Sequence, residues 1–500
     1  MTVVQKITGA TPCLGKRWES INWKKAEAEV RRLKMRIAKA VQEGKWNKVK
    51  ALQWLLTHSF SAKLLAVKKV TSNKGGHTPG VDGVTFNTPA RKMLGALLLK
   101  RRGYKAKPLK RIMIPKKNGK KRPLGIPSIA DRAMQALYLL ALEPISETWA
   151  DINSYGFRPY RACRDAIGQC FCALAKKYSP KWILEGDIKA CFDWIDHSWL
   201  LANIPIDKQV LKQWLACGFM QDKKLFPTIA GTPQGGIISP TLANMALDGL
   251  EKAVKDASVR KDKVNFIRYA DDFIITAASE EHLKNVIVPT IKEFLIQRGL
   301  TLSEEKTRIV NIEQGFDFLG QNIRKYRNKL IIKPAKANVK SFKEKVKSII
   351  EKGRGWNAEW LINVLNPVIR GWANYHRYIQ SAKTFSIMHI IINNALMKWA
   401  KHNNSSKTPK WIRKRFFGLS PKGRFSCLSM DKKGKKKLLE LISPCDIPLV
   451  RYIKIKGKSN PYDPQYCEYF GMRNHAKNYR PILTDNLTAG LLLKGDLPRA

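Results

Sequence analysis

The sequence has no long hydrophobic run. No apolar stretch approaches the roughly 18 residues that a membrane-spanning helix needs. The opening residues, MTVVQKITGATPCLGK, also lack the apolar core of a signal peptide. We therefore expect no membrane partner and a cytoplasmic location.

Paired cysteines are missing as well. The nine cysteines are scattered, the only close pair is Cys170 and Cys172, and no CxxC occurs. A disulfide framework or a zinc site needs regularly paired cysteines. We interpret these thiols as reduced and mostly structural.

Acidic residues are scarce: 39 Asp and Glu stand against 92 Lys and Arg, so the 500 residues carry a formal net charge of +53. Such a chain repels itself unless it binds a polyanion, and nucleic acid is the expected one. The length allows roughly three or four domains or subdomains.

Two of the few acidic residues are adjacent. Asp271 and Asp272 lie in NFIRYADDFIIT, which runs from Asn265 to Thr276. The β-prone residues on both sides predict two strands, with the acidic pair and Ala270 at the turn. Neighbouring carboxylates repel each other unless a divalent cation lies between them. The alternative is a polar hairpin tip that faces solvent.

A third carboxylate, Asp187, follows a predicted strand in WILEGDIKACFDWIDH. If the two strands are neighbours, three carboxylates converge. Phosphoryl transfer by two metal ions needs such a set, which holds two Mg²⁺ ions roughly 4 Å apart. The pattern thus favours a phosphoryl-transfer site.

Helices and loops are predicted around these strands. Residues 20–72 predict two helices, separated at Gly44. The second of these helices runs through Trp46, Val49, Leu52, Trp54 and Leu55.

Residues 111–127 predict a β-hairpin whose cationic tip could hold a triphosphate. The tip contains Lys116, Lys117, Lys120, Lys121 and Arg122.

Further helices are predicted downstream. One begins after Ser128 and is ended by Pro144, and another runs from His197 to Met220. A glycine-rich loop, GTPQGG, then precedes a helix with Ser239 as its N-cap. The buried side of that helix comprises Leu242, Ala246, Leu250 and Val254.

From about Trp18 to Phe470 the chain resembles bacterial group II intron-encoded reverse transcriptases with maturase activity. Seven blocks match in order: GVDGVT, IPKKNGKKRPLGIP, NSYGFRPYR, DIKACFD, GTPQGGIISP, RYADD, and LTLSEEKTRIV followed by GFDFLG. The resemblance implies an α+β, right-hand polymerase fold with fingers, palm and thumb. It implies an antiparallel palm sheet and a helical thumb or maturase domain.

The resemblance also implies a domain order. We expect an N-terminal helical extension over 1–95, fingers over 96–186, a palm with the catalytic carboxylates over 187–330, and a thumb and maturase (X) domain over 331–430. Residues 431–500 would be a basic DNA-binding segment and a shortened tail. Because no CxxC follows residue 400, we expect no C-terminal endonuclease domain.

The catalytic residues implied by the family are Asp187, Asp271 and Asp272, which with Ile188 would bind two Mg²⁺ ions. Lys306, in SEEKT, could donate a proton to the leaving pyrophosphate, or could simply be solvated.

Four residues would bind the incoming nucleotide: Lys116, Arg122, Phe192 and Gln234. Phe192 would clash with a ribose 2′-hydroxyl and so select deoxynucleotides; a core aromatic is the alternative. RNA contacts are expected from Arg370, Trp372, Tyr375 and Arg377, a mixture of cations and aromatics suited to phosphates and bases. The alternative is that the aromatics belong to the core.

The function implied is an RNA-directed DNA polymerase, a nucleotidyltransferase. It would bind a group II intron RNA, assist its splicing and copy it at a DNA target during retrohoming. Its partners would be the intron RNA, the DNA target and primer, and deoxynucleotides, at the bacterial nucleoid when it is bound to DNA. A homodimer is allowed. The alternatives are a splicing-only maturase and another bacterial reverse transcriptase, of the retron, diversity-generating or defence kind.

Overall fold

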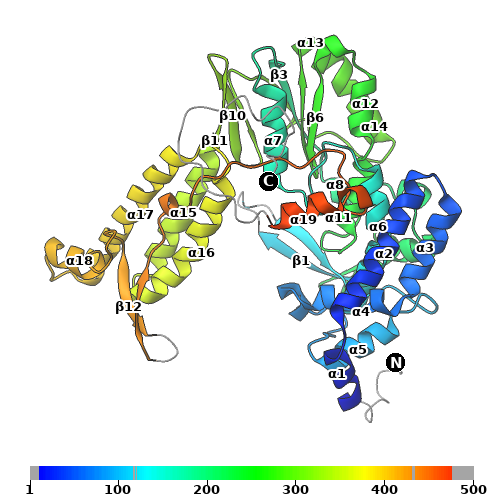
Figure 1. Cartoon of the computed structure of the whole chain (residues 1–500), viewed down its shortest axis with the longest axis horizontal. Helices are drawn as coiled ribbons and strands as arrows, with labels where there is room; N and C mark the ends of the chain where they lie inside the picture. The colour runs from blue at the N-terminus through cyan, green and yellow to red at the C-terminus, as the bar shows by residue number, and fades with distance from the viewer. Residues whose placement is uncertain (1–10, 116–118, 120, 431–433, 476–500) are drawn as a thin grey trace. The chain divides into compact units, whose positions relative to one another are not determined.

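The chain leaves its first folding unit at Asn311 and returns to it at Lys454. In the computed structural model, which describes residues 11–115, 119, 121–430 and 434–475, one unit comprises the chain up to Asn311 together with Lys454–Asn474. The second unit contains Ile312–Ile453. Each unit combines helices with antiparallel strand pairs (Figure 1), so the predicted α+β class is confirmed.

The N-terminal part of the first unit is helical, with more breaks than predicted. Ser59 ends one helix and caps the next, because its hydroxyl accepts a hydrogen bond from the Ala62 amide at 3.4 Å. The exposed fractions of Trp54 and Leu55 are 61% and 45%, so these two residues do not lie on the buried face of their helix. The helices are α1 (Thr11–Glu19), α2 (Trp23–Gln42), α3 (Trp46–His58), α4 (Phe60–Thr71) and α5 (Pro89–Leu98).

The predicted cationic hairpin is confirmed as β1 (Leu109–Pro115) and β2 (Lys121–Ile126), which pair antiparallel. They belong to a four-stranded sheet of order β2-β1-β4-β5, which we call the fingers sheet. Strands β4 (Phe219–Gln221) and β5 (Lys224–Phe226) complete it. Residues 116–118 and 120 of the hairpin tip lie outside the described residues.

The helix predicted from His197 to Met220 is wrong in its extent. Pro205 interrupts it, and Asp207 starts a new helix by accepting from the amides of Gln209 and Val210. The result is α9 (His197–Asn203) and α10 (Lys208–Ala216), while Met220 lies in β4.

Pro144 does not end its helix, contrary to the prediction. Helix α6 runs over Ile129–Trp149 with Ser128 as N-cap. The turn beyond Pro144 survives because Ile145 is fully buried and Glu147 pairs with Arg158 at 2.9 Å. Burial thus offsets the hydrogen bond that the proline removes.

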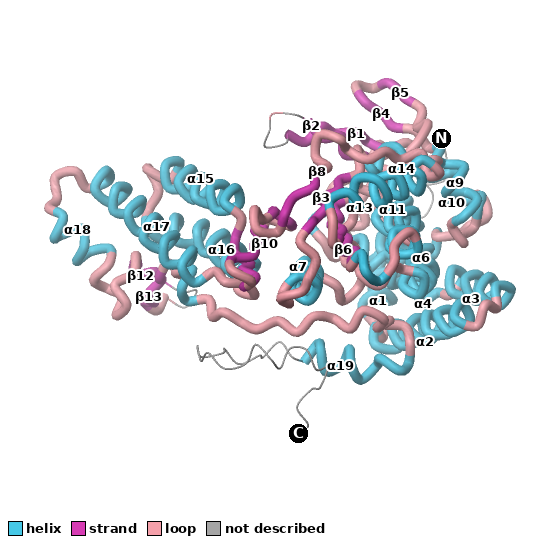
Figure 2. The backbone as a smooth tube through the Cα atoms, turned by 90° about the horizontal axis from the view of Figure 1, so that it is seen from above, coloured by secondary structure: helices cyan, strands magenta, loops and turns pink. Residues whose placement is uncertain are grey.

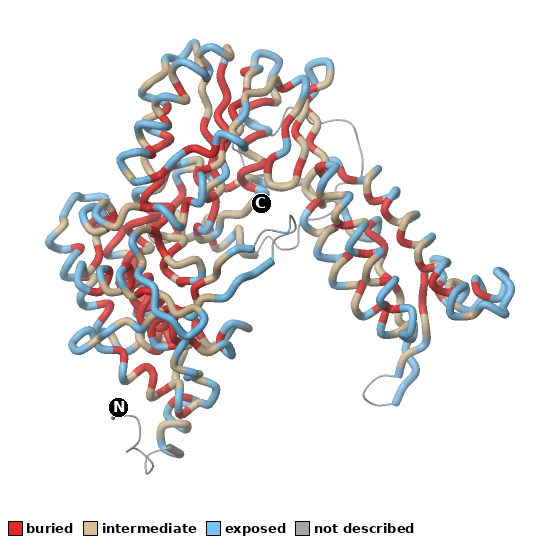
Figure 3. The backbone as a smooth tube through the Cα atoms, turned by 180° about the vertical axis from the view of Figure 1, so that it is seen from behind, coloured by how far each residue is buried: buried red, intermediate tan, exposed pale blue. Residues whose placement is uncertain are grey.

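A second sheet, which we call the palm sheet, has the order β6-β7-β3-β8 with antiparallel neighbours. Of its inner strands, β7 is buried from Phe273 onward and β3 at Ile183, Leu184 and Gly186. Figure 3 draws the buried segments of the chain in red. The strands are β3 (Trp182–Asp187), β6 (Asn265–Tyr269), β7 (Asp272–Ala277) and β8 (Arg308–Asn311).

Helices surround this sheet in the first unit (Figure 2). The helix predicted after GTPQGG starts at Ser239 itself, with Ile238 as N-cap, and it breaks at Gly249, where φ is 97°. The four residues predicted on its buried side are all buried. The helices are α7 (Cys163–Leu174), α8 (Cys191–Trp194), α11 (Ser239–Leu247), α12 (Leu250–Asp256), α13 (Glu280–His282), α14 (Val288–Ile296) and, after the chain returns, α19 (Cys467–His475).

The second unit joins a three-stranded antiparallel sheet to a helix bundle. The sheet has the order β11-β10-β9, and the bundle core includes Phe342, Val346 and Leu365. Its elements are β9 (Phe316–Phe318), β10 (Gln321–Tyr326), β11 (Lys329–Pro334), α15 (Lys336–Lys352), α16 (Ala358–His376), α17 (Ala382–Asn403), α18 (Pro409–Phe416), β12 (Ser426–Met430) and β13 (Lys436–Glu440). Within the described ranges, we find no helix of both the length and the apolar character that crossing a membrane requires.

Candidate active site

The predicted acidic hairpin is present between β6 and β7. Tyr269 pairs with Asp272, so Ala270 and Asp271 form a two-residue turn. Ala270 has a φ of 60°, which costs a residue with a side chain about 1–2 kcal/mol. The surrounding structure must hold this turn in place.

The loop at Asn153–Gly156 holds it. The Arg268 amide donates to the Asn153 carbonyl and the Tyr155 amide donates to the Arg268 carbonyl, both at 2.9 Å. A Cβ atom added to Gly156 would lie 2.4 Å from the Ala270 nitrogen. Only glycine therefore allows this loop to lie against the turn. Gly156 belongs to the matched NSYGFRPYR block, but no sequence pattern predicts its role.

The buried guanidinium of Arg268 supports the hairpin. Arg268 is fully buried and its guanidinium donates to Asp248 at 2.6 Å and to Asn244 at 3.2 Å. Removing one partner of a buried ion pair leaves an uncompensated charge. No periodicity or spacing singles out Arg268 and Asp248, because the pairing depends on the fold.

The structure brings two of the three predicted carboxylates face to face. Asp187, at the end of β3, is paired in register with Asp272, at the start of β7. Asp271 precedes Asp272 in the turn, so all three lie at one edge of the palm sheet. This arrangement concentrates negative charge at that edge.

The pKa values report the same repulsion. Desolvation and the negative charges of Asp271 and Asp187 raise the pKa of Asp272 to about 7. Desolvation and, to a smaller extent, Asp187 also raise the pKa of Asp271. A bound cation would offset this repulsion between the carboxylates.

The residues fit a divalent cation such as Mg²⁺, because hard cations prefer oxygen ligands. Asp187 and Asp272 could share such a cation. Ile188 could contribute only its backbone carbonyl, because the Ile188 side chain is apolar and 1% exposed. In the part of the chain that the structure describes, no three Asp, Glu, His or Cys side chains already form a metal cluster.

Lys306 is not simply solvated. Its ammonium lies 2.7 Å from the Asp187 carboxylate, and this hydrogen bond raises the pKa of Lys306. The Lys306 amide also donates to the Ser303 carbonyl, and Ser303 donates to the Asp187 carbonyl. The lysine is thus placed at the carboxylate edge.

Two predicted nucleotide-binding residues contact each other. Arg122 in β2 donates to the Gln234 side chain at 2.6 Å, and Gln234 donates to Asp193 at 2.9 Å. These bonds join the fingers sheet to the PQGG loop. Lys116 lies outside the described residues.

Phe192 is half-buried just after Asp187. Its ring meets the edge of Phe157, with ring centroids 6.2 Å apart. Phe157 is 53% exposed and has a φ of 57°. Phe157 belongs to the matched NSYGFRPYR block, but its contact with Phe192 is not predicted from the sequence.

The four predicted RNA-binding residues lie on or next to α16. Arg370 is exposed, and Arg377 donates to the Pro448 carbonyl at 3.2 Å. Trp372 stacks on Phe342 with centroids 4.1 Å apart, and the Tyr375 hydroxyl donates to the Leu319 carbonyl at 2.8 Å. The aromatic rings thus also serve packing, and RNA contact stays a prediction.

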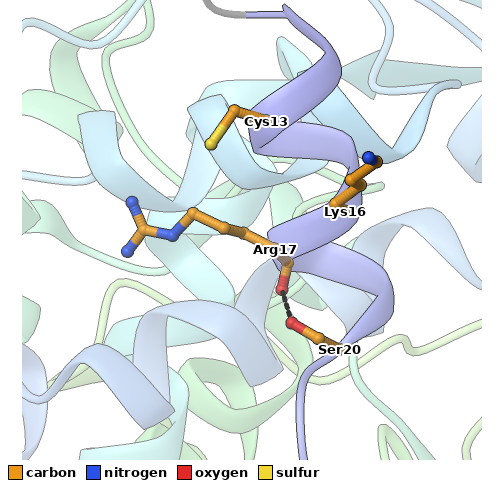
Figure 4. Close-up of a pocket in the computed structure, with 4 residues that line it drawn as sticks. All are labelled: Cys13, Lys16, Arg17 and Ser20. Carbon is orange, nitrogen blue, oxygen red and sulfur yellow. Dashed lines mark hydrogen bonds between the residues drawn. The ribbon is translucent and has the colours of Figure 1, made fainter.

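A surface pocket lies apart from the residues of this site. It measures about 450 Å³ and is lined by Cys13, Lys16, Arg17 and Ser20, all from α1 (Figure 4). The dashed line in Figure 4 marks the hydrogen bond that the Ser20 hydroxyl donates to the Arg17 carbonyl. No residue predicted to act in catalysis lines it.

The palm sheet with its carboxylate edge defines a polymerase of the reverse transcriptase class. The chain matches the family "Reverse transcriptase (RNA-dependent DNA polymerase)" over residues 114–323. It also matches the N-terminal domain of reverse transcriptase over 18–99 and the maturase-specific domain of group II introns over 339–417. The chain belongs to the family of bacterial group II intron-encoded reverse transcriptases and maturases.

Named relatives agree. The group II intron-encoded protein LtrA of Lactococcus lactis subsp. cremoris is 30% identical over 57% of this chain and 59% of its own length. Protein YkfC of Escherichia coli K12 is 31% identical over 53% of this chain and 80% of its own. The match thus spans little more than half of LtrA. A Candida albicans telomerase structure gives a TM-score of 0.35 at 14% identity, covering 64% of this chain and 63% of that chain.

Proposed function

We propose that the protein is an RNA-directed DNA polymerase that works by two-metal-ion nucleotidyl transfer. The observation that carries this proposal is the meeting of Asp187 with Asp272 across β3 and β7, with Asp271 in the adjoining turn. Reverse transcriptases as a family use divalent metal ions, and this edge supplies their preferred oxygen ligands.

The reaction joins the primer 3′-hydroxyl to the α-phosphate of a deoxynucleotide and releases pyrophosphate. Asp187, Asp271, Asp272 and the Ile188 carbonyl would hold two Mg²⁺ ions, which supply charge stabilisation when bound. Lys306, beside Asp187, donates a proton to the departing pyrophosphate. Arg122 binds the triphosphate, and its bond to Gln234 aligns the two residues toward the incoming nucleotide.

Sugar selection falls to Phe192. The edge-on contact with Phe157 limits how far the Phe192 ring can turn away, so a 2′-hydroxyl meets a fixed obstacle. The site would therefore use deoxynucleotides and discriminate against ribonucleotides.

We further propose that the protein binds a group II intron RNA, assists its splicing and reverse-transcribes it at a DNA target. The match of residues 339–417 to the intron maturase domain supports this, as does the formal charge of +53. Exposed Arg370 is the best placed of the four predicted contacts. Since phosphate contacts dominate, binding should weaken steeply with salt.

A paired assay tests the proposal. Wild type and the Asp271→Ala, Asp272→Ala variant are given a DNA primer on an RNA template and, separately, a group II intron precursor. We expect the variant to lose primer extension and to retain RNA binding and splicing. If wild type splices the precursor but extends no primer, the splicing-only maturase is the correct function. Extension by both proteins would remove the acidic hairpin from catalysis.

A further inference from the structure

The segment by which the chain returns to its first unit makes an unexpected set of contacts. We propose that residues 454–473, which we call the strap, position the catalytic hairpin by holding the loop that supports it. The proposal rests on the polymerase function proposed above. The family resemblance implies that the basic first part of this segment belongs to a DNA-binding region. Figure 2 shows it as an extended loop that leads into α19.

The middle of the strap is fixed to α2 and α6. The Tyr462 hydroxyl and the Lys34 ammonium both donate to the Glu143 carboxylate, Lys34 at 2.6 Å. Asp463 accepts from Gln42 at 3.1 Å. In Figure 1 the red helix α19 accordingly lies beside the blue helix α2. A charge-assisted cluster of this kind anchors the segment firmly.

Both ends of the strap meet one buried carboxylate. Asp165, in the first turn of α7, is fully buried. It accepts from the Ile455 amide at 2.8 Å and from the Arg473 guanidinium at 2.9 Å, and also from the Ala162 amide at 2.9 Å. The strap is thereby closed into a loop, and losing Arg473 would leave a buried charge with one partner fewer.

The strap reaches the hairpin through Arg161. The Arg161 guanidinium donates to the Gly457 carbonyl at 2.9 Å and lies 5.7 Å from the centre of the Tyr155 ring. The Tyr155 amide in turn bonds the Arg268 carbonyl of β6. A continuous set of contacts therefore joins the strap to the strand that ends at the catalytic turn.

This support matters because the turn is strained at Ala270, where φ is 60°. Strained backbone persists only where neighbouring structure holds it. Since misplacement of a catalytic group by about 1 Å can cost roughly a hundredfold in rate, loosening the strap should reduce turnover. Arg473 and Arg161 are positioning residues in this scheme, because the contacts described join neither of them to Asp187, Asp271 or Asp272.

The test compares four full-length variants: Arg473→Met, Arg473→Lys, Arg161→Met and Lys50→Met. Lys50 is the matched control, since it is an exposed cation of the same unit, on α3 and outside both the strap and the segment predicted to bind DNA. We expect Arg473→Met to lower kcat about tenfold and to raise the Mg²⁺ concentration for half-maximal rate. Its affinity for primer-template should match that of Lys50→Met, and Arg473→Lys should recover most of kcat. Arg161→Met should behave like Arg473→Met.

Hydrogen exchange supplies a readout that does not need polymerase activity. In Arg473→Met the amides of Tyr155 and Arg268 should exchange about tenfold faster than in wild type, while Lys50→Met leaves them unchanged. Unchanged exchange in Arg473→Met, with kcat equal to that of Lys50→Met, would overturn the proposed role of the strap. If no protein extends primers and exchange still changes as expected, the proposed polymerase function fails and the strap stands.

Discussion

Asp187 and Asp272 stand opposite each other across strands β3 and β7, although they are 85 positions apart in the chain (272 − 187 = 85). Their juxtaposition concentrates charge that only a proton, an ammonium or a metal ion can offset. Lys306 provides the ammonium at 2.7 Å from Asp187. One cation and three carboxylates thus meet at this edge of the palm sheet.

The role of Lys306 can be separated from its charge. Lys306→Met should lower kcat about a hundredfold, because general acids contribute about 10²–10⁴. Lys306→Arg keeps the positive charge beside Asp187 but cannot release a proton near neutral pH. Single-turnover incorporation measures both variants. Full activity in Lys306→Arg would show that charge alone is required and that Lys306 is not the proton donor.

The space at Gly156 should be essential for catalysis. Gly156→Ala places a methyl group 2.4 Å from the Ala270 nitrogen, so the turn must shift, and we expect kcat to fall about a hundredfold. Gly15→Ala is the matched control, because no atom lies within 4 Å of its added Cβ. Primer extension with thermal unfolding of each variant decides the matter. Equal activity in the two variants would contradict the close approach described.

Sugar selection should depend on Phe192. Phe192→Ala removes the ring that a 2′-hydroxyl would meet, and we expect ribonucleotide incorporation relative to deoxynucleotide to rise about tenfold or more. Phe157→Ala should give a smaller rise, since it removes only the edge contact at 6.2 Å. The measurement is the ratio of kcat/KM for the two nucleotides. No change in Phe192→Ala would assign that ring to the core.

Acid should weaken the second unit through His376. Burial lowers the pKa of His376 from 6.5 to about 4, and the ring is fully buried beside Asn338. The unfolded chain therefore binds the proton more tightly, so stability falls as pH drops below about 6.5, by about 3 kcal/mol at pH 4. Urea unfolding followed by tryptophan fluorescence should show this loss, and His376→Gln should reduce it. An equal loss in the variant would place the acid sensitivity elsewhere.

Local patterns sufficed for the acidic hairpin, because β-prone runs on both sides of an adjacent acidic pair are sequence-local signals. The same was true of β1 and β2. Patterns failed where burial overrides a local signal, as at Pro144, which stays inside α6 because Ile145 and Glu147 are buried. They also failed for His197–Met220, where a proline and a capping aspartate divide the helix.

Apart from the convergence of Asp187 with the acidic pair, contacts between distant residues could not be predicted. Arg473 bonds Asp165 across 308 positions and Ile455 bonds it across 290. In a chain with 92 Lys and Arg, nothing distinguishes a cation that pairs internally from one that binds nucleic acid. The roles of Gly156, Arg268 and Arg473 emerge only once the chain is folded.

The most direct test of the central claim is the rate of single-nucleotide incorporation on an RNA template as a function of Mg²⁺ concentration, in wild type and in Asp272→Asn. Asp272→Asn keeps the size of the side chain and removes one charge from the edge that faces Asp187. We expect Mg²⁺-dependent incorporation by wild type, and a variant at least about a thousandfold slower at every Mg²⁺ concentration. Incorporation by the variant at the wild-type rate, with the same Mg²⁺ dependence, would contradict the account.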